Sequence, residues 1–121
     1  MSPFTIRASQ FEAFESAAEE RFVQGLVAFL RESVPGASDD PPGELKAFTE
    51  SMVRKAEGYG LTTQRDAAIY TTCAYMLGEN FEEHFHPARR TLNSTLPGPD
   101  KAAWLTDATV ALIDSQGRLP Q

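Results

Sequence analysis

The sequence contains one cysteine, Cys73, and neither a phosphate-binding glycine loop nor a dinucleotide-binding fingerprint. A single cysteine excludes an intramolecular disulfide and a zinc site built from cysteine pairs. Cys73 lies in an apolar segment between Tyr70 and Leu77, with no cation nearby in sequence to lower its pKa. We therefore expect a buried, unreactive thiol rather than a nucleophile.

Long apolar runs are also absent. The longest, such as Leu26 to Leu30, are far too short to span a bilayer. The first residues show no apolar segment followed by a small-residue cleavage site, so we expect no secretory signal peptide. These absences predict a bacterial cytoplasmic protein that has no membrane partner.

Basic residues are fewer than acidic ones and are not clustered. The chain has 11 Lys and Arg against 17 Asp and Glu, which gives a net charge of −6. Its adjacent basic pairs, Arg54-Lys55 and Arg89-Arg90, lie in no larger basic run. This argues against nucleic acid as a partner, because phosphate backbones require clustered positive charge. A basic protein surface remains a suitable partner, because an acidic face can steer association with it.

The length and composition are those of one globular domain. The 121 residues are 41% hydrophobic and 23% charged, close to globular averages. A domain of this size buries roughly two-thirds of its unfolded surface. We expect a single domain over residues 1–121, with 1–8 and 117–121 as flexible tails.

Hydrophobic residues recur at three- and four-residue steps, which predicts helices along most of the chain. The first helix is expected from a capping box at Ser9 and Glu12 to about Ser33, with Phe22 and Phe29 buried. Turn residues divide the rest into further expected helices. One runs from Pro41 to Gly58 or Gly60, where one glycine is expected at positive φ. The next runs from a cap at Thr62 or Thr63 to a stop at Gly78, with Ile69, Cys73, Met76 and Leu77 buried. A short turn over 81–85 precedes a helix over 87–96, and Asp100 caps the last helix, over 101–116. No strand-like alternation is present. The fold class expected is all-α: an irregular bundle of four main helices plus one short helix.

Residue types that bind metals gather in one segment: Glu79, Glu82, Glu83, His84 and His86. On a helix, Glu83-x-x-His86 would place a carboxylate and an imidazole one turn apart, as in di-metal carboxylate bundles. Those sites need the motif twice, and the two histidines of this chain, His84 and His86, both lie in this one segment. We therefore expect an acidic helix start with no metal, no other cofactor and no catalytic residue. A small metal-dependent enzyme using Glu83 and His86 is the less favoured alternative.

Large aromatic residues are frequent near the N-terminus, where a small bundle offers little shelter. Phe4, Phe11 and Phe14 are expected to form an apolar patch that binds a partner protein or a second copy in a homodimer. The acidic residues between and after them would form its polar rim: Glu12, Glu15 and Glu19.

Two segments carry a resemblance to a known group of proteins: Ala56-Glu-Gly-Tyr-Gly-Leu-Thr-Thr-Gln-Arg-Asp66 and Met76-Leu-Gly-Glu-Asn-Phe81. With Phe11-x-x-Phe14 and Arg21-Phe22-Val23, they resemble small helical proteins encoded beside type VI secretion effectors, near genes for PAAR spike-tip proteins or effector chaperones. In that group, one helix ends in a turn like the one in segment 56–66, and the next helix ends in a turn like the one in segment 76–81. The resemblance covers about residues 9 to 113.

The resemblance implies a non-catalytic accessory role, such as co-chaperone or adaptor in loading an effector. The implied partner is an effector, an effector chaperone or a spike-tip protein. An immunity protein that occludes a toxin with its acidic face is the alternative from a different class.

Overall fold

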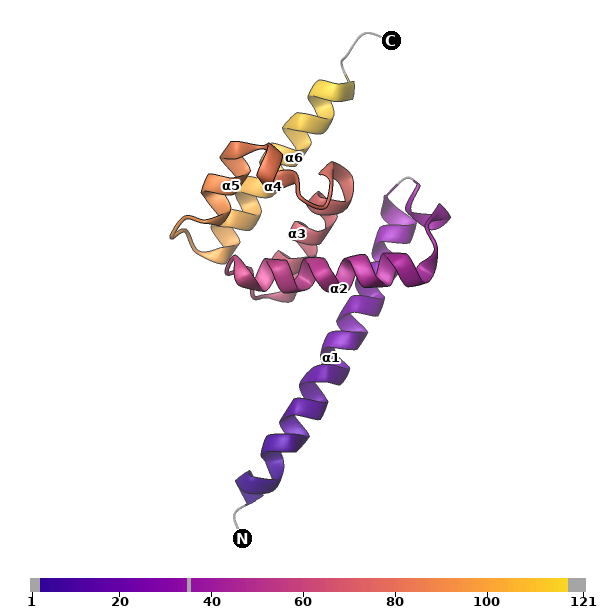
Figure 1. The fold of residues 1–121 in the computed structure, drawn as a ribbon, viewed down its shortest axis with the longest axis vertical. Helices are drawn as coiled ribbons and strands as arrows, with labels where there is room; N and C mark the ends of the chain where they lie inside the picture. Colours follow the sequence, from indigo (N-terminus) through magenta and orange to yellow (C-terminus); the bar gives the residue numbers. More distant parts are fainter. Residues whose placement is uncertain (1–2, 35, 118–121) are drawn as a thin grey trace. The chain divides into compact units, whose positions relative to one another are not determined.

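A computed structural model describes residues 3–34 and 36–117, with the side chains of 18–34, 36–41 and 43–114 (Figure 1). Over these residues the chain is helical and contains no strand. The elements are α1 (Pro3–Ser33), the 3-10 turn η1 (Ala37–Asp39), α2 (Pro42–Gly58), α3 (Gln64–Leu77), α4 (Phe81–His84), α5 (His86–Leu92) and α6 (Gly98–Gly117). The predicted all-α fold is confirmed, with four longer helices and two short ones in the region where one was expected. No helix in the described part of the chain combines the length and apolarity that crossing a bilayer requires.

The chain forms two compact units, Met1–Ala47 and Phe48–Gln121, and the boundary falls within α2. The first unit contains α1, η1 and the first residues of α2. The second contains the rest of α2 and all later helices. The single domain expected from the sequence stays a prediction, because this division does not show whether either unit folds alone.

In the first unit, α1 begins at Pro3, six residues before the expected capping box at Ser9. Proline suits the first position of a helix, because its fixed φ is already helical and no N–H is lost from the ladder. Farther along, the buried face is centred on Val23, Leu26 and Leu30. Phe29 is 49% exposed, so its expected burial was wrong. Each residue turns by about 100° around a helix, which places Phe29 on the flank of that face.

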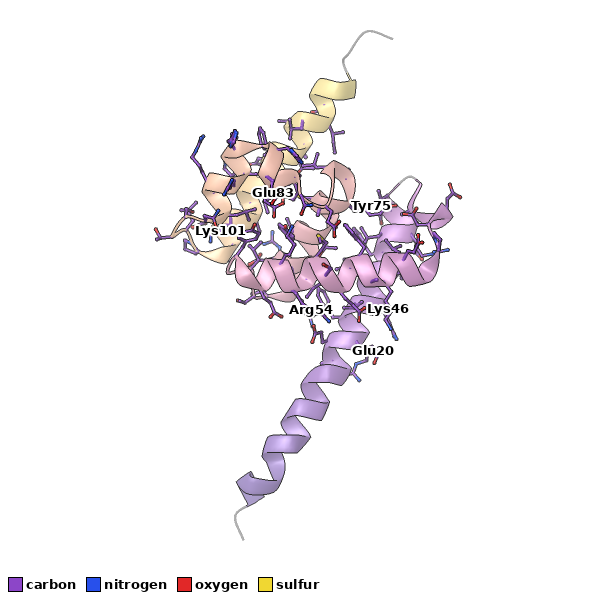
Figure 2. The ribbon with its side chains drawn as sticks, viewed as in Figure 1. Glu20, Lys46, Arg54, Tyr75, Glu83 and Lys101 are labelled. Carbon is purple, nitrogen blue, oxygen red and sulfur yellow. The ribbon has the colours of Figure 1, made fainter. Side chains whose placement is uncertain are left out.

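The connection from α1 to α2 is held by hydrogen bonds to backbone carbonyls. The Arg31 guanidinium donates to the carbonyls of Asp40, at 3.2 Å, and Ser38, at 3.3 Å. α2 begins at Pro42, one residue later than expected. An exposed ion pair, 3.8 Å long, joins Lys46 of α2 to Glu20 of α1 (Figure 2).

In the second unit, α3 begins and ends where the sequence predicts. The hydroxyl of Thr63 caps it by accepting a 3.1 Å hydrogen bond from the backbone N–H of Asp66. Gly78 follows its last residue. The buried face differs from the expected one, because Met76 is 43% exposed. The residues that are buried on α3 are Asp66, Ala67, Tyr70, Thr71, Cys73 and Ala74.

α3 and α6 pack side by side and run in the same direction. Near their N-terminal ends, a Cβ added to Gly98 would lie 3.3 Å from the Asp66 carboxylate and 2.6 Å from the carbonyl oxygen of Gly60. A side chain therefore does not fit at position 98. Farther along, the Thr109 hydroxyl donates to Sγ of Cys73 at 3.1 Å.

The short helices α4 and α5 complete this unit (Figure 1). Phe85, between them, stacks on Trp104 of α6 with ring centroids 6.2 Å apart. α5 ends at Leu92 rather than near Leu96, because side chains close the turn there. The Asn93 amide donates to the carbonyl of Arg89. α6 begins at Gly98, three residues before the expected first residue, 101.

The turn after α2 requires a glycine at one of its two glycine positions. Gly60 has φ +86°, whereas Gly58 is the last residue of α2 and has open space at its Cβ position. Gly60→Ala should lower the free energy of unfolding by about 1 kcal/mol, because L-residues disfavour the left-handed region. Gly58→Ala should not destabilise the protein. Thermal melts of both variants test this, and a Gly60→Ala variant that melts like the parent would contradict it.

Candidate functional site

A buried carboxylate, Glu82, joins three helices of the second unit. Its Oε2 atom accepts hydrogen bonds from the hydroxyls of Tyr70, at 2.8 Å, and Tyr59, at 2.9 Å. The same oxygen lies 3.1 Å from Nζ of Lys55. Lys55 lies in the last turn of α2, and Tyr59 follows that helix directly, four residues later. Residues four apart lie on the same side of a helix, so both can reach Glu82 near the start of α4. We call these four residues the Glu82 cluster.

Electrostatic contacts keep Glu82 ionised in this cluster. Burial by itself raises the pKa of Glu82, but its own backbone N–H, the two tyrosine hydroxyls and the Lys55 ammonium lower it by more. The net pKa of Glu82 is therefore below its ordinary value. Burial and the Glu82 carboxylate together raise the pKa of Tyr59 to about 12 and that of Tyr70 further. Both hydroxyls thus stay protonated and act as donors.

A buried lysine, Lys101, forms a second polar contact point in the same unit. Its ammonium donates to the carbonyls of Tyr59, at 2.7 Å, and Leu92, at 2.8 Å. Tyr59 directly follows α2 and Leu92 ends α5, so one cation satisfies carbonyls at the C-terminal ends of two helices. Figure 2 labels Lys101 near these ends. Sequence analysis missed this role, although Lys101 lies four residues before the buried Leu105 and so shares its helical face.

Cys73 is buried between α3 and α6, as predicted. Burial raises the pKa of its thiol, and the hydrogen bond from Thr109 only partly offsets this effect. Ellman's reagent should therefore label the folded protein very slowly and label one thiol per chain after denaturant is added. Rapid stoichiometric labelling of the folded protein would show that Cys73 is accessible as a thiolate.

The predicted metal-type motif does not form one helical turn. Glu83 belongs to α4 and His86 begins α5, with Phe85 between them in extended backbone at φ −120° and ψ 95°. The side chains of Glu83, His84 and His86 are all exposed. Within the described side chains, no three His, Cys, Asp or Glu residues are grouped so as to hold a metal ion.

The predicted partner-binding patch falls almost wholly outside the described side chains. The backbone of Phe4, Phe11, Glu12, Phe14 and Glu15 belongs to α1, and their side chains lie in the part that is not described. Glu19 is described and is exposed. The patch therefore stays a prediction.

A surface pocket of about 410 Å³ opens at the C-terminal end of α3. It is formed by the end of α3, the turn into α4, α4 itself and α6. The lining residues are Leu77, Gly78, Glu79, Asn80, Phe81, His84, Phe85 and Leu112. We call this the α3-end pocket.

The Glu82 cluster also fixes one edge of the α3-end pocket. Lys55, which pairs with Glu82, donates in addition to the Glu79 carbonyl, at 3.0 Å, and to Oδ1 of Asn80, at 3.3 Å. Both residues line the pocket. The turn between α3 and α4 is thereby anchored to α2, so the cluster serves to hold the pocket's shape.

Apolar side chains are exposed close to this pocket in sequence. Met76, next to the lining residue Leu77, is 43% exposed, and Val110, two residues before Leu112, is 54% exposed. Concave apolar surface with a few polar groups at its edge is typical of a binding site. Compared with known proteins, the chain matches no family model, no curated protein and no solved structure.

Proposed function

We propose that this chain is a non-catalytic accessory protein that acts by binding another protein. The observation that carries the proposal is the α3-end pocket, with walls formed by Leu77, Phe85 and Leu112. Met76, which precedes Leu77 in the sequence, is also exposed. Apolar side chains that remain accessible in a concave surface gain free energy when a partner removes them from water.

The contacts of the buried charged groups support a structural role for them. Glu82 and Lys101 are bonded to hydroxyls, an ammonium group or carbonyls of neighbouring helices. Each holds helix ends together, and in our proposal neither takes part in chemistry on a substrate.

For the partner, we propose an effector, an effector chaperone or a spike-tip protein of a type VI secretion system. This part rests on the sequence resemblance at residues 56–66 and 76–81. The second resembling segment overlaps the lining of the α3-end pocket at all five residues from Leu77 to Phe81. The second candidate role is that of an immunity protein that occludes a toxin. Such a protein also needs an exposed binding surface.

Co-expression tests the proposal. The tagged chain is produced with each product of the genes that flank its own, and complexes are isolated by affinity and size-exclusion chromatography. We expect one flanking product to co-elute in a stoichiometric complex. If none does, and if deleting the gene alters neither effector secretion nor protection from a toxin, the proposal is wrong.

The same complexes separate the two candidate roles. An adaptor should bind a spike-tip or chaperone product, and its loss should reduce effector secretion. An immunity protein should bind the toxin and inhibit it in a purified assay.

A further inference from the structure

The α3-end pocket has a negative electrostatic character. Its lining includes the carboxylate Glu79, while the described residues that line it include no Lys or Arg. Lys55, whose ammonium contacts this turn, is paired with the buried Glu82. Among the described side chains, Glu79 and Glu83 form no ion pair within 4 Å. The described side chains therefore supply no bonded counter-charge to these two carboxylates.

The end of α3 adds to this negative potential. Leu77 is the last residue of the helix, and Leu77 and Gly78 both line the pocket. The last carbonyls of a helix carry partial negative charge, and cations are favoured next to them. The pocket thus offers a carboxylate and a helix C-terminus to the same occupant.

The walls of the pocket are suited to a long aliphatic stem. Leu77 and Leu112 are half-buried, and Phe85, whose ring stacks on Trp104, adds an aromatic side chain to the lining. Lys and Arg bury their methylene stems against apolar surface while their charged heads stay near polar groups. A guanidinium can in addition lie against an aromatic face.

We infer that the α3-end pocket binds a Lys or Arg side chain of the partner, presented on a segment that is basic and apolar. The inference rests on the proposed protein-binding function and specifies the partner's chemistry. The stem contacts Leu77, Phe85 and Leu112, and the charged head lies toward Glu79 and the end of α3.

NMR titration of the isotope-labelled full chain tests this with defined probes. The first probe is the capped peptide Gln-Ala-Leu-Arg-Leu-Ala-Gln, and the second has Gln in place of Arg. We expect the Arg peptide to shift the amide signals of residues 77–85 and Leu112, and the Gln peptide to bind about tenfold more weakly. Equal binding of the two peptides, shifts confined to other residues, or no shift with the Arg peptide would overturn the inference.

Charge reversal provides the matched pair of variants. Glu79→Lys should weaken binding of the Arg peptide about fivefold, and more salt should weaken it in the parent. Glu57→Lys makes the same charge change at an exposed position of α2 outside the pocket lining, and it should leave the affinity within about twofold. If both reversals weaken binding equally, the preference for the Arg peptide comes from the protein's overall charge and not from the α3-end pocket. That result would contradict the inference.

The inference and the proposed function fail in different ways. If a flanking gene product binds the chain and Glu79→Lys does not weaken that complex, the basic-side-chain inference is wrong and the protein-binding function stands. If no flanking product binds and deleting the gene alters neither effector secretion nor protection from a toxin, while the Arg peptide occupies the pocket, the proposed function is wrong and the pocket's preference stands.

Discussion

Replacing Glu82 with Met should lower the free energy of unfolding by about 3 kcal/mol. The substitution introduces an apolar side chain of similar size. It leaves the hydroxyls of Tyr59 and Tyr70 and the ammonium of Lys55 without their shared acceptor. Removing one partner of a buried pair is costly, because the remaining polar groups stay desolvated. Urea denaturation followed by circular dichroism measures the change.

The adjacent residue supplies the control. Glu83 belongs to the same short helix and carries the same charge, but its side chain is exposed. Glu83→Met should change stability by less than about 0.5 kcal/mol. If Glu82→Met were as mild as Glu83→Met, the Glu82 cluster would not stabilise the fold as described.

The stabilisation by Glu82 should also depend on pH, with a sign set by the direction of its shift. The folded protein lowers the pKa of Glu82 from 4.5. Its contribution is therefore fully present above about pH 4.5 and is lost as the pH falls through the lower, folded value. In urea titrations from pH 7 to pH 3, the stability difference between the parent and Glu82→Gln should shrink at the acidic end. A difference that grows on acidification would show that the pKa is raised instead.

Replacing Lys101 with Met should destabilise the protein by about 2–4 kcal/mol. Lys101 is only 6% exposed, and its ammonium bonds to two carbonyls. Met fills the space of the methylene stem and leaves the carbonyls of Tyr59 and Leu92 without this donor. The loss should appear in urea denaturation as a lower midpoint.

Lys46 serves as the control for this substitution. It lies on α2, has a side chain that is 44% exposed and forms an exposed 3.8 Å ion pair with Glu20. Lys46→Met removes the same group but should cost less than about 1 kcal/mol, because exposed ion pairs contribute little. Equal losses from the two lysine variants would contradict the role assigned to Lys101.

The helices and their boundaries follow from local chemistry, so much of the fold could be predicted from the sequence. The Thr63 cap, the stop at Gly78 and the left-handed glycine after α2 were all visible as turn residues next to a periodic apolar segment. Which face of a helix is buried was harder to predict. Phe29 and Met76 are large and apolar, yet both are exposed, because burial depends on what packs against each face.

The buried polar contacts could not be predicted for a related reason. Lys55, Tyr70 and Glu82 are far apart in the sequence, and only the packing of α2, α3 and α4 brings them to one oxygen atom. An acidic helix start, which the sequence predicts at Glu82, accounts for the charge of this residue but not for its burial. The spacing Glu83-x-x-His86 places the two side chains one turn apart only on a continuous helix. The chain is extended at Phe85, so the two residues do not share a helical turn.

The α3-end pocket could not be predicted from the sequence either, although part of its lining lies in segment 76–81, which carries the resemblance. Leu77 and Phe81 belong to the resembling segment 76–81, but Phe85 and Leu112 join them only through folding. The aromatic patch near Phe4, Phe11 and Phe14 remains a separate prediction for the partner surface. Binding data can distinguish the two surfaces.

Hydrogen–deuterium exchange of the chain, free and bound to the flanking gene product that co-elutes with it, tests the central claim most directly. We predict that binding slows exchange at residues 77–85 and around Leu112, where the partner covers the α3-end pocket. Protection confined to residues 4–19 would assign binding to the aromatic patch of α1 instead. Unchanged exchange over 77–85 in a stoichiometric complex would contradict the claim that this pocket is the partner-binding surface.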